Sequence, residues 1–376
     1  MTVYRFEEIA HNINDKKMPV PGDEKTYIGL EHLDTGSLQV TRWGQDVVLT
    51  GEKLVMKKGD VLFGRRNTYL RRAAIAPHDG IFSAHGMIFR PKTDVIDAEF
   101  FPFFISSDYF IDEAIKISVG SLSPTVNWGT LKKLEFDLPS MEEQKRLAKI
   151  LMAAEETRQA YKKLIKQTDD LIKAKFEEMF GKETCKKSLH DICNCFCDGD
   201  WIESKDQSDT GIRLIQTGNV GEGYYINKDS GKARYITEET FNKLHCTEVK
   251  TGDILVSRLP DPVGRACIVP EYVGKAITAV DCAIIRLKTI LLPEFFIAFT
   301  LSTDYNQQIN SFITGSTRKR ISRNNLGSIQ IPVPSIEKQQ EFVDFLQQAE
   351  QTKLATQQSL DSLNETVRAL VNRNFN

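Results

Sequence analysis

The 376-residue sequence lacks the marks of membrane-spanning and secreted proteins. No apolar run approaches the roughly 18 residues that a helix needs to cross a bilayer. The first ten residues carry charge where a signal peptide would have an apolar core. Seven cysteines, an odd number, are too few for a disulfide scaffold in a chain of this length. We therefore expect a protein of the reducing cytoplasm that does not associate with a membrane.

Motifs for catalysis and metal binding are also missing. A phosphate-binding loop requires Gly-x-x-x-x-Gly-Lys-Ser/Thr, but Gly274-Lys275 is followed by Ala276 and lacks the first glycine. The Asn/Asp-Pro-Pro-aromatic motif of adenine methylases is absent, since Val263 follows Asp261-Pro262. The six histidines include no His-x-x-x-His pair. We expect a chain that is not an enzyme and that binds neither a metal nor a cofactor itself.

Zinc binding by a cysteine cluster is an alternative to this expectation. Cys193, Cys195 and Cys197 lie close together in sequence, with Cys185 and His190 nearby. Their spacing differs from the Cys-x-x-Cys of a zinc knuckle. Alternation along a strand would instead place all three on one buried face, where free cysteines are common. We favour the buried strand.

The sequence also lacks the overall positive charge of a typical nucleic-acid-binding domain, because its net charge is −2. Positive charge is nevertheless concentrated in two segments. Residues 57–72 hold six lysines and arginines against one acid, Asp60, and residues 313–327 hold four against none. Both segments are compatible with contact to phosphates, and equally with a solvated surface.

The chain repeats itself. Gly59-Asp60-Val61-Leu62 returns as Gly252-Asp253-Ile254-Leu255, at a lag of 193 residues. Pro139-Ser140-Met141-Glu142 returns as Pro334-Ser335-Ile336-Glu337, at a lag of 195. So many ordered matches at one lag indicate a tandem duplication.

Each copy begins with a segment of mixed α/β pattern. Short apolar runs broken by turn residues predict strands at 47–49, 61–63, 73–76 and 87–89, and at 254–256, 266–269 and 283–285. Apolar residues at spacings of three and four predict one helix over 98–117 and another over 293–313. We expect two α/β (α+β) domains in tandem.

Each copy ends in a long helix. Residues Ser140 to Phe180 contain no glycine or proline, and their apolar residues recur every three or four positions. Ser140 and Glu143 form a predicted capping box, whereas Ser335 is a plainer cap because Lys338 replaces the acid. At 1.5 Å per residue each helix would span about 60 Å. We expect the two helices to pair as an antiparallel intramolecular coiled coil with pseudo-twofold symmetry. The alternative is that each helix packs only on its own domain.

These patterns divide the chain into a first domain over 1–139, a helix over 140–181, a second domain over 182–334 and a second helix over 335–376.

The motifs resemble a known family. Pro-Ser-x-Glu-x-Gln before a long charged helix, found at 139–144 and 334–339, is similar to the helical regions of type I restriction–modification specificity subunits. The Gly-Asp segments at 59–62 and 252–255 resemble a strand of their target-recognition domains, and Gly218-Asn219-Val220 resembles another recurrent segment. The first domain has Leu30-Glu31-His32-Leu33 at the similar position, which departs from that pattern.

The resemblance implies a DNA-binding subunit without a catalytic site. Each domain would recognise one half of a bipartite site in double-stranded DNA, and the helices would set the gap between the halves. Two methylation subunits would assemble on the helices, and restriction subunits would join them. S-adenosylmethionine, ATP and Mg²⁺ would belong to those partners.

Base edges and phosphates call for polar and cationic side chains. In the first domain the candidate DNA-binding residues are Arg65, Arg66, Asn67, Tyr69, Arg71 and Arg72. In the second they are Arg258, Arg265, Arg318, Lys319, Arg320 and Arg323. The lag of 193 places Arg258 and Arg265 at the positions of Arg65 and Arg72.

Three alternatives stay open at this point. The chain could be a scaffold that joins protein partners, or a stand-alone nuclease, although we identify no carboxylate cluster for the latter. A similar chain would also serve a Type IIB or a methylation-only system.

Overall fold

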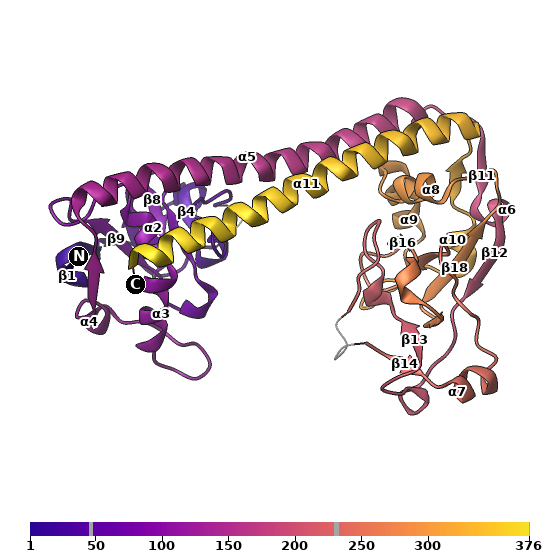
Figure 1. Ribbon diagram of the computed structural model, residues 1–376, viewed down its shortest axis with the longest axis horizontal. Helices are drawn as coiled ribbons and strands as arrows, with labels where there is room; N and C mark the ends of the chain where they lie inside the picture. Colours follow the sequence, from indigo (N-terminus) through magenta and orange to yellow (C-terminus); the bar gives the residue numbers. More distant parts are fainter. Residues whose placement is uncertain (45–47, 229–232, 376) are drawn as a thin grey trace. The chain divides into compact units, whose positions relative to one another are not determined.

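The computed structural model describes residues 1–44, 48–228 and 233–375. The chain forms two compact units (Figure 1). Unit 1 comprises Met1–Lys163 and Gln357–Asn376, and unit 2 comprises Leu164–Thr356. Among the described residues, no helix is both long enough and apolar enough to cross a membrane.

Unit 1 contains an antiparallel four-stranded sheet, a second mixed sheet and a two-stranded ribbon. The first sheet has the order β2 (Ala10–Ile13), β9 (Met87–Pro91), β6 (Val61–Phe63), β7 (Ala73–Ile75). The second has the order β3 (Lys16–Lys17), β5 (Lys53–Met56), β8 (Gly80–Phe82), β4 (Tyr27–Ile28), with β4 and β8 parallel. The ribbon pairs β1 (Thr2–Arg5) with β10 (Glu135–Leu138). The helices are α1 (Phe6–Ile9), α2 (Phe101–Ser106), α3 (Asp108–Lys116) and α4 (Trp128–Leu131).

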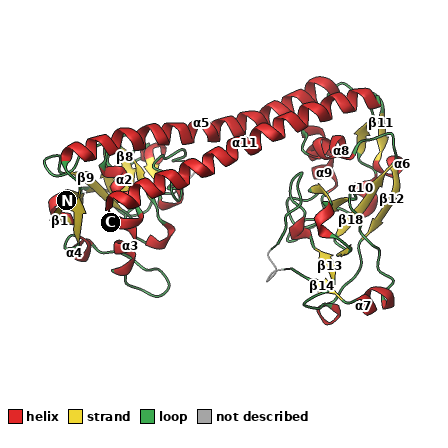
Figure 2. Cartoon of the chain, viewed as in Figure 1, coloured by secondary structure: helices red, strands yellow, loops and turns green. Residues whose placement is uncertain are grey.

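Unit 2 repeats the antiparallel sheet and the ribbon of unit 1, but its mixed sheet has a different strand order. Its antiparallel sheet has the order β12 (Cys193–Asp198), β18 (Cys282–Leu287), β15 (Ile254–Ser257), β16 (Ala266–Ile268). Its mixed sheet has the order β14 (Tyr235–Ile236), β13 (Ile212–Ile215), β17 (Ala276–Thr278), with β13 and β17 parallel. The ribbon pairs β11 (Lys186–Ser188) with β19 (Gln330–Pro332). The helices are α6 (Leu189–Ile192), α7 (Glu238–Lys243), α8 (Pro293–Thr300), α9 (Thr303–Phe312) and α10 (Arg323–Gly327). The repeat confirms two α/β domains of one fold (Figure 2).

The predicted strands at 61–63, 73–76, 87–89, 254–256, 266–269 and 283–285 are confirmed. The prediction of a strand at 47–49 is wrong for the two residues that the structure describes, because Val48 and Leu49 lie in a loop. Val47 lies outside the described residues. The helices expected over 98–117 and 293–313 are each two helices. Ser107 ends α2, and its hydroxyl accepts from Phe110 N at the start of α3 at 3.2 Å. Ser302 caps α9 in the same way, because its hydroxyl accepts from Tyr305 N at 3.2 Å. A serine cap inside an apolar pattern therefore breaks both predicted helices.

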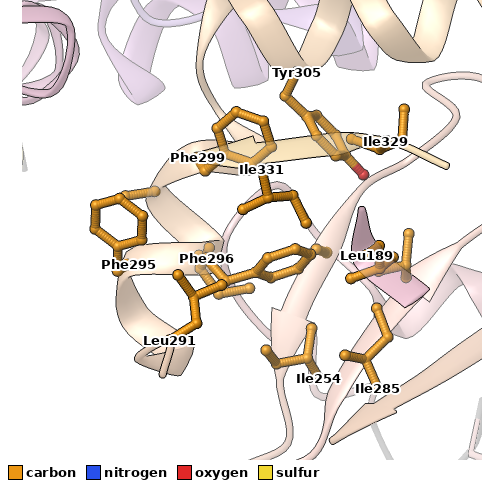
Figure 3. Close-up of a cluster of buried hydrophobic side chains, with 14 of the residues drawn as sticks. Leu189, Ile254, Ile285, Leu291, Phe295, Phe296, Phe299, Tyr305, Ile329 and Ile331 are labelled. Atoms are coloured by element: carbon orange, nitrogen blue, oxygen red, sulfur yellow. The ribbon is translucent and has the colours of Figure 1, made fainter. Parts of the chain in front are cut away.

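The main core of unit 2 lies between its antiparallel sheet and α8. Phe295, Phe296 and Phe299 of α8 pack with Ile254 and Ile285 of the sheet (Figure 3). The Tyr305 hydroxyl within this core donates to the carbonyl of Gly264 at 2.8 Å. Unit 1 has the equivalent core, centred on phenylalanines of the sheet, α2 and α3. These cores fix the sheet edges and loops that carry the exposed residues described below.

Helices α5 (Met141–Phe180) and α11 (Ile336–Phe375) extend through both units, and each unit holds one half of each. In unit 2, Phe176 contacts Phe342 with ring centroids 5.3 Å apart, and Lys353 Nζ lies 2.7 Å from Asp169 Oδ1. A later residue of α5 thus meets an earlier residue of α11, which confirms antiparallel pairing (Figure 1). Each half also packs on its own domain, since Phe176 belongs to the core of unit 2 and Leu147 to the core of unit 1.

The predicted caps of the long helices are formed only in part. The Ser140 hydroxyl accepts from Glu143 N at 3.3 Å, as a helix cap should. The Glu143 carboxylate does not complete the capping box but accepts from Arg146 at 2.7 and 2.5 Å, and this lowers the pKa of Glu143. The Ser335 carbonyl accepts from Gln339 N at 3.1 Å, and the Ser335 side chain bonds to Glu337, whose pKa is lowered.

The glutamine of the Pro-Ser-x-Glu-x-Gln motif joins each long helix to its domain. Gln144 is buried, accepts from Asp97 N at 2.8 Å, and donates to the carbonyls of Pro139 at 2.9 Å and Val95 at 3.3 Å. Gln339 makes the same three bonds to the equivalent backbone groups of unit 2. The repeated motif is therefore explained by an anchor at the helix start.

Candidate nucleic-acid interface

An exposed hairpin follows helix α3 in unit 1. We call Val119–Thr125 hairpin 1, because the two end residues exchange backbone hydrogen bonds of 3.1 and 3.0 Å. Gly120 has φ +119°, a left-handed conformation that suits glycine. Val126 N donates to the carbonyl of Arg65 at 2.9 Å, and Asn67 N donates to that of Pro124 at 2.7 Å. The basic segment around Arg65 therefore supports hairpin 1.

Unit 2 has the equivalent hairpin at a lag of 195. We call Thr314–Arg320 hairpin 2; its end residues exchange two backbone hydrogen bonds of 3.0 Å, and Gly315 has φ +93°. Ile321 N donates to the carbonyl of Arg258 at 3.1 Å, just as Val126 does to Arg65. The two hairpins are held in the same way.

The two hairpins expose different chemistry. Leu122 at the tip of hairpin 1 is 95% exposed, and Val119 is 71% exposed. Hairpin 2 instead exposes Arg318, Lys319 and Arg320. Leu122 was not among the residues predicted from sequence, because an isolated leucine in a loop gives no signal until the hairpin is seen.

The predicted residues of unit 1 fall into two groups. Arg66 and Tyr69 are exposed, and neither side chain has a hydrogen bond or ion pair with a described residue. Arg65, Asn67 and Arg72 are half-buried. The Arg65 Nε and Asn67 Oδ1 atoms are buried without a hydrogen-bond partner among the described residues. These two unsatisfied groups lie beside hairpin 1.

Arg71 differs from its neighbours because its guanidinium group is already paired with two carboxylates. Its guanidinium lies 2.6 Å from both Asp108 and Asp112 of α3. Arg368 of α11 binds the other oxygen of Asp108 at 2.9 Å. Arg71 therefore ties its loop to α3 and α11 within unit 1, which is a structural role.

Arg258 and Arg265 of unit 2 are also held inside the domain. Arg258 Nη2 donates to the Val280 carbonyl at 2.7 Å and lies 3.2 Å from Asp198. Arg265 makes long hydrogen bonds to the Thr217 carbonyl, at 3.4 Å, and to the Ser257 hydroxyl, at 3.3 Å. Both arginines support loops, and neither is a surface cation.

The other predicted cations of unit 2 lie on or just after hairpin 2 and are exposed. Arg318 and Arg320 are exposed, and their guanidinium groups have no partner among the described residues. Lys319 lies 3.5 Å from Asp261, and Arg323 lies 3.6 Å from Asp198, both at exposed positions. Pairs this long and exposed contribute little to stability, so both cations are available to a ligand.

The repeated Gly-Asp motif has a structural explanation. Asp60 is buried and accepts from Arg90 at 2.9 and 3.0 Å and from Lys57 N at 2.8 Å. Asp253 accepts from Arg286 and from Lys250 N in the same geometry. Each aspartate raises the pKa of its arginine. The motif therefore closes a turn within each domain.

The departure at Leu30–Leu33 is also explained. In unit 2 the Asn219 side-chain oxygen accepts from Gln216 N at 2.9 Å across a short turn. In unit 1 the Nδ1 atom of His32 accepts from Gly29 N at the same 2.9 Å. Histidine replaces asparagine because each supplies an acceptor to the same backbone turn.

The cysteine prediction is wrong in its geometry. A bulge in β12 between Cys193 and Cys195 breaks the alternation. Cys193 packs on the main core of unit 2, whereas Cys195 and Cys197 lie together with sulfur atoms 3.7 Å apart. All three are half-buried, and burial raises the pKa of Cys193 to about 12 and that of Cys197 to about 11. Within residues 1–44, 48–228 and 233–375 no group of three or more His, Cys, Asp or Glu side chains could hold a metal.

Two domains of one fold, each with an exposed hairpin of different chemistry and each followed by a long helix, define a duplicated two-domain protein. The family model described as the type I restriction modification DNA specificity domain matches residues 1–168 and 182–365. The chain belongs to this family, and the two matched segments correspond to the two copies of the repeat.

Individual relatives agree with this assignment. The chain is 20% identical to the type I restriction enzyme MjaVIII specificity subunit of Methanocaldococcus jannaschii, over 92% of this chain and 84% of that protein. It is 24% identical to the putative MjaX specificity subunit of the same organism, over 82% of this chain and 76% of that one.

Solved structures show the same fold. A chain from a structure on complex assembly and conformational transition of the type I R-M system matches with a TM-score of 0.61 and 16% identity. This match covers 100% of our chain and 97% of that one. The type I S subunit from M. genitalium matches with a TM-score of 0.56 and 13% identity, over 100% and 96% of the two chains. The resemblance of the sequence to type I specificity subunits is thereby confirmed.

Proposed function

We propose that each unit recognises one half of a bipartite site in double-stranded DNA. The observation that carries this proposal is the pair of hairpins, which share one support and differ in the side chains they expose. An apolar tip such as Leu122 suits a thymine methyl group, and cations such as Arg318 suit guanine edges or phosphates. Two domains of one fold can therefore select different half-sites.

We further propose that the long helices set the gap between the half-sites and hold two methylation subunits, which restriction subunits then join. Helices α5 and α11 have 40 residues each, or about 60 Å at 1.5 Å per residue. This length exceeds one DNA turn of about 34 Å. Exposed apolar residues on these helices, such as Ile150, Leu171 and Leu354, offer contacts to a partner.

In this proposal the chain is not itself an enzyme. S-adenosylmethionine, ATP and Mg²⁺ bind to the partner subunits, and the complex works in the cytoplasm, where the host DNA lies. A Type IIB or methylation-only system would use the same chain without a separate restriction subunit.

The direct test is co-expression with the methylation subunit encoded beside this chain, followed by sequencing of host DNA for N6-methyladenine. A methylated bipartite motif with a fixed gap supports the proposal. Replacing residues 1–139 with those of a relative should then change one half of the motif only. A stable complex that adds no methylation counts against DNA recognition and favours a protein scaffold.

The gap is tested by lengthening both helices. Four helical residues inserted after Lys163 and four after Thr356 add about 6 Å to each helix. Because DNA rises about 34 Å in 10 base pairs, the gap should grow by about two base pairs. An insertion in α5 alone is the control, since it mismatches the helices and should lower activity without a new gap. An unchanged gap after the double insertion contradicts this role of the helices.

A further inference from the structure

A basic pocket lies in unit 2, away from hairpin 2 in sequence. Its volume is about 320 Å³, and it adjoins strands β13 and β14. The side chains that matter for its chemistry are those of Arg213, Tyr225, Tyr235, Tyr272 and Lys275. We call it the Arg213 pocket. It was not predicted from the sequence, because its residues are scattered over more than 60 positions.

Arg213 is buried without a counter-ion. Only 9% of the residue is exposed, and no described residue places a carboxylate on its guanidinium. Its Nη1 atom makes a long hydrogen bond of 3.4 Å to the Tyr235 hydroxyl, and its Cζ atom lies 5.4 Å from the centre of that ring. An aromatic ring compensates a buried cation only in part. The site therefore favours an incoming anion.

More positive charge surrounds the pocket. The pKa of Lys228 is lowered by burial and by the positive charges of Arg213 and Arg234. Lys275 is already paired with Glu238 and lies over the Phe241 ring, so it contributes less. Tyr225 packs edge-on against Tyr272, a residue that is 65% exposed. The pocket therefore combines one buried cation in need of a partner, Arg213, with tyrosine hydroxyls that can donate. Lys228 adds positive charge near Arg213 but does not line the pocket.

Among the residues that the structure describes, unit 1 has no such site. Strands β4 and β8 pair as β13 and β17 do, which places Thr26 where unit 2 has Arg213. The turn before Thr26 holds Asp23 and Glu24, and Asp23 Oδ1 lies 2.8 Å from Lys17 Nζ. An anion would be repelled there. The asymmetry is what two domains with different half-sites would show.

We propose that Arg213, with the tyrosine hydroxyls and near the positive charge of Lys228, binds a backbone phosphate of the DNA half-site recognised by unit 2. Guanidinium groups form strong charge-assisted hydrogen bonds with phosphate oxygens, and a DNA phosphate would supply the missing counter-charge. Such a contact fixes the position of the domain on the duplex and carries no base preference. This inference rests on the proposed function.

The test measures DNA binding by the complex of this chain with its methylation subunit. Two duplexes are compared, one that contains the bipartite sequence that the complex methylates and one that lacks it. Arg213→Met should lower the affinity about tenfold for both DNAs, and Lys228→Ala, which removes a nearby charge outside the pocket lining, should lower it by a smaller factor. The slope of log affinity against log salt should fall by about one, and the methylated motif should stay unchanged. Lys205→Ala is the matched control, because Lys205 is exposed and paired with Glu203.

Stability separates a binding role from a structural one. Arg213→Met should leave the melting temperature equal or higher, since it removes a buried cation without a counter-ion. A lower melting temperature, with Lys228→Ala binding like the wild type, would show that Arg213 is structural and overturn the inference. A change in the methylated motif would also overturn it, because a phosphate contact is independent of sequence.

Inorganic phosphate distinguishes a DNA site from a site for a free anion. Phosphate that raises the melting temperature of the wild type but not of Arg213→Met, together with unchanged DNA affinity of the variant, assigns the pocket to a free anion and overturns the DNA contact. If the wild-type complex does not bind DNA at all, the proposed function fails. If the wild type binds and both variants bind equally well, only this inference fails.

Discussion

Replacing Gln339 by alanine should destabilise unit 2 by about 3 kcal/mol. Gln339 is fully buried, and its amide makes three hydrogen bonds of 2.9 Å to Leu292 N and to the carbonyls of Ile290 and Pro334. Each such bond contributes about 1 kcal/mol, and its loss leaves a buried backbone group without a partner. Three losses give the expected total, since the alanine side chain replaces none of the bonds.

Urea denaturation followed by circular dichroism measures this loss, and hydrogen exchange of peptides from α8 and β18 locates it in unit 2. Gln340→Ala is the control. Gln340 is the next residue and is exposed, and its amide donates to Asp344 one turn later, so its replacement should cost less than about 0.5 kcal/mol. Equal effects of the two substitutions would refute the argument that the motif glutamine anchors the helix.

Further predictions concern unit 1. Arg71→Ala should cost about 1 kcal/mol of stability, because its ion pairs are partly exposed, and should leave DNA affinity within about twofold of the wild type in a filter-binding assay. Leu122→Ser should change the methylated sequence in one half of the motif and leave the other half intact, as seen by sequencing. Asp23 has a pKa held below its usual 3.8 by the hydrogen bond from Lys17. Its stabilising effect is therefore present above about pH 4 and lost as pH falls through the folded-state pKa, so Asp23→Asn should lower the melting temperature at pH 6 but not near pH 2.

The duplication explains why the fold was predictable from one sequence. The repeat at a lag of 193 to 195 residues allows the two copies to be compared with each other, so a strand pattern in one copy is independent support for the same strand in the other. The long helices were predictable because 40 residues without glycine or proline have few alternatives. The split at Ser107 was missed because the apolar spacing continues across the cap.

The candidate site was less predictable because charge in sequence does not reveal its partners. Arg71 pairs with Asp108, which is 37 residues away, and Arg258 lies beside Asp198 from another strand. Only the fold shows that these arginines are already paired with acids of their own unit. Arg213 was missed for the opposite reason, since nothing in the sequence shows that it is buried without an acid.

The basic segments contain residues of two kinds: some support the hairpins through their backbone, and others expose their side chains at the hairpin tips. The backbone carbonyls of Arg65 and Arg258 support the hairpins in the same way in both copies, whatever side chains the hairpins carry. Among the described residues, the exposed side chains of Leu122 and Arg318 at the tips make no hydrogen bond to this support. A tip can therefore change from apolar to cationic without cost to the fold. If recognition resides there, new half-sites arise by substitution on the hairpins, and exchanging the tip residues 121–123 and 316–318 should exchange part of the specificity between the two halves of the motif.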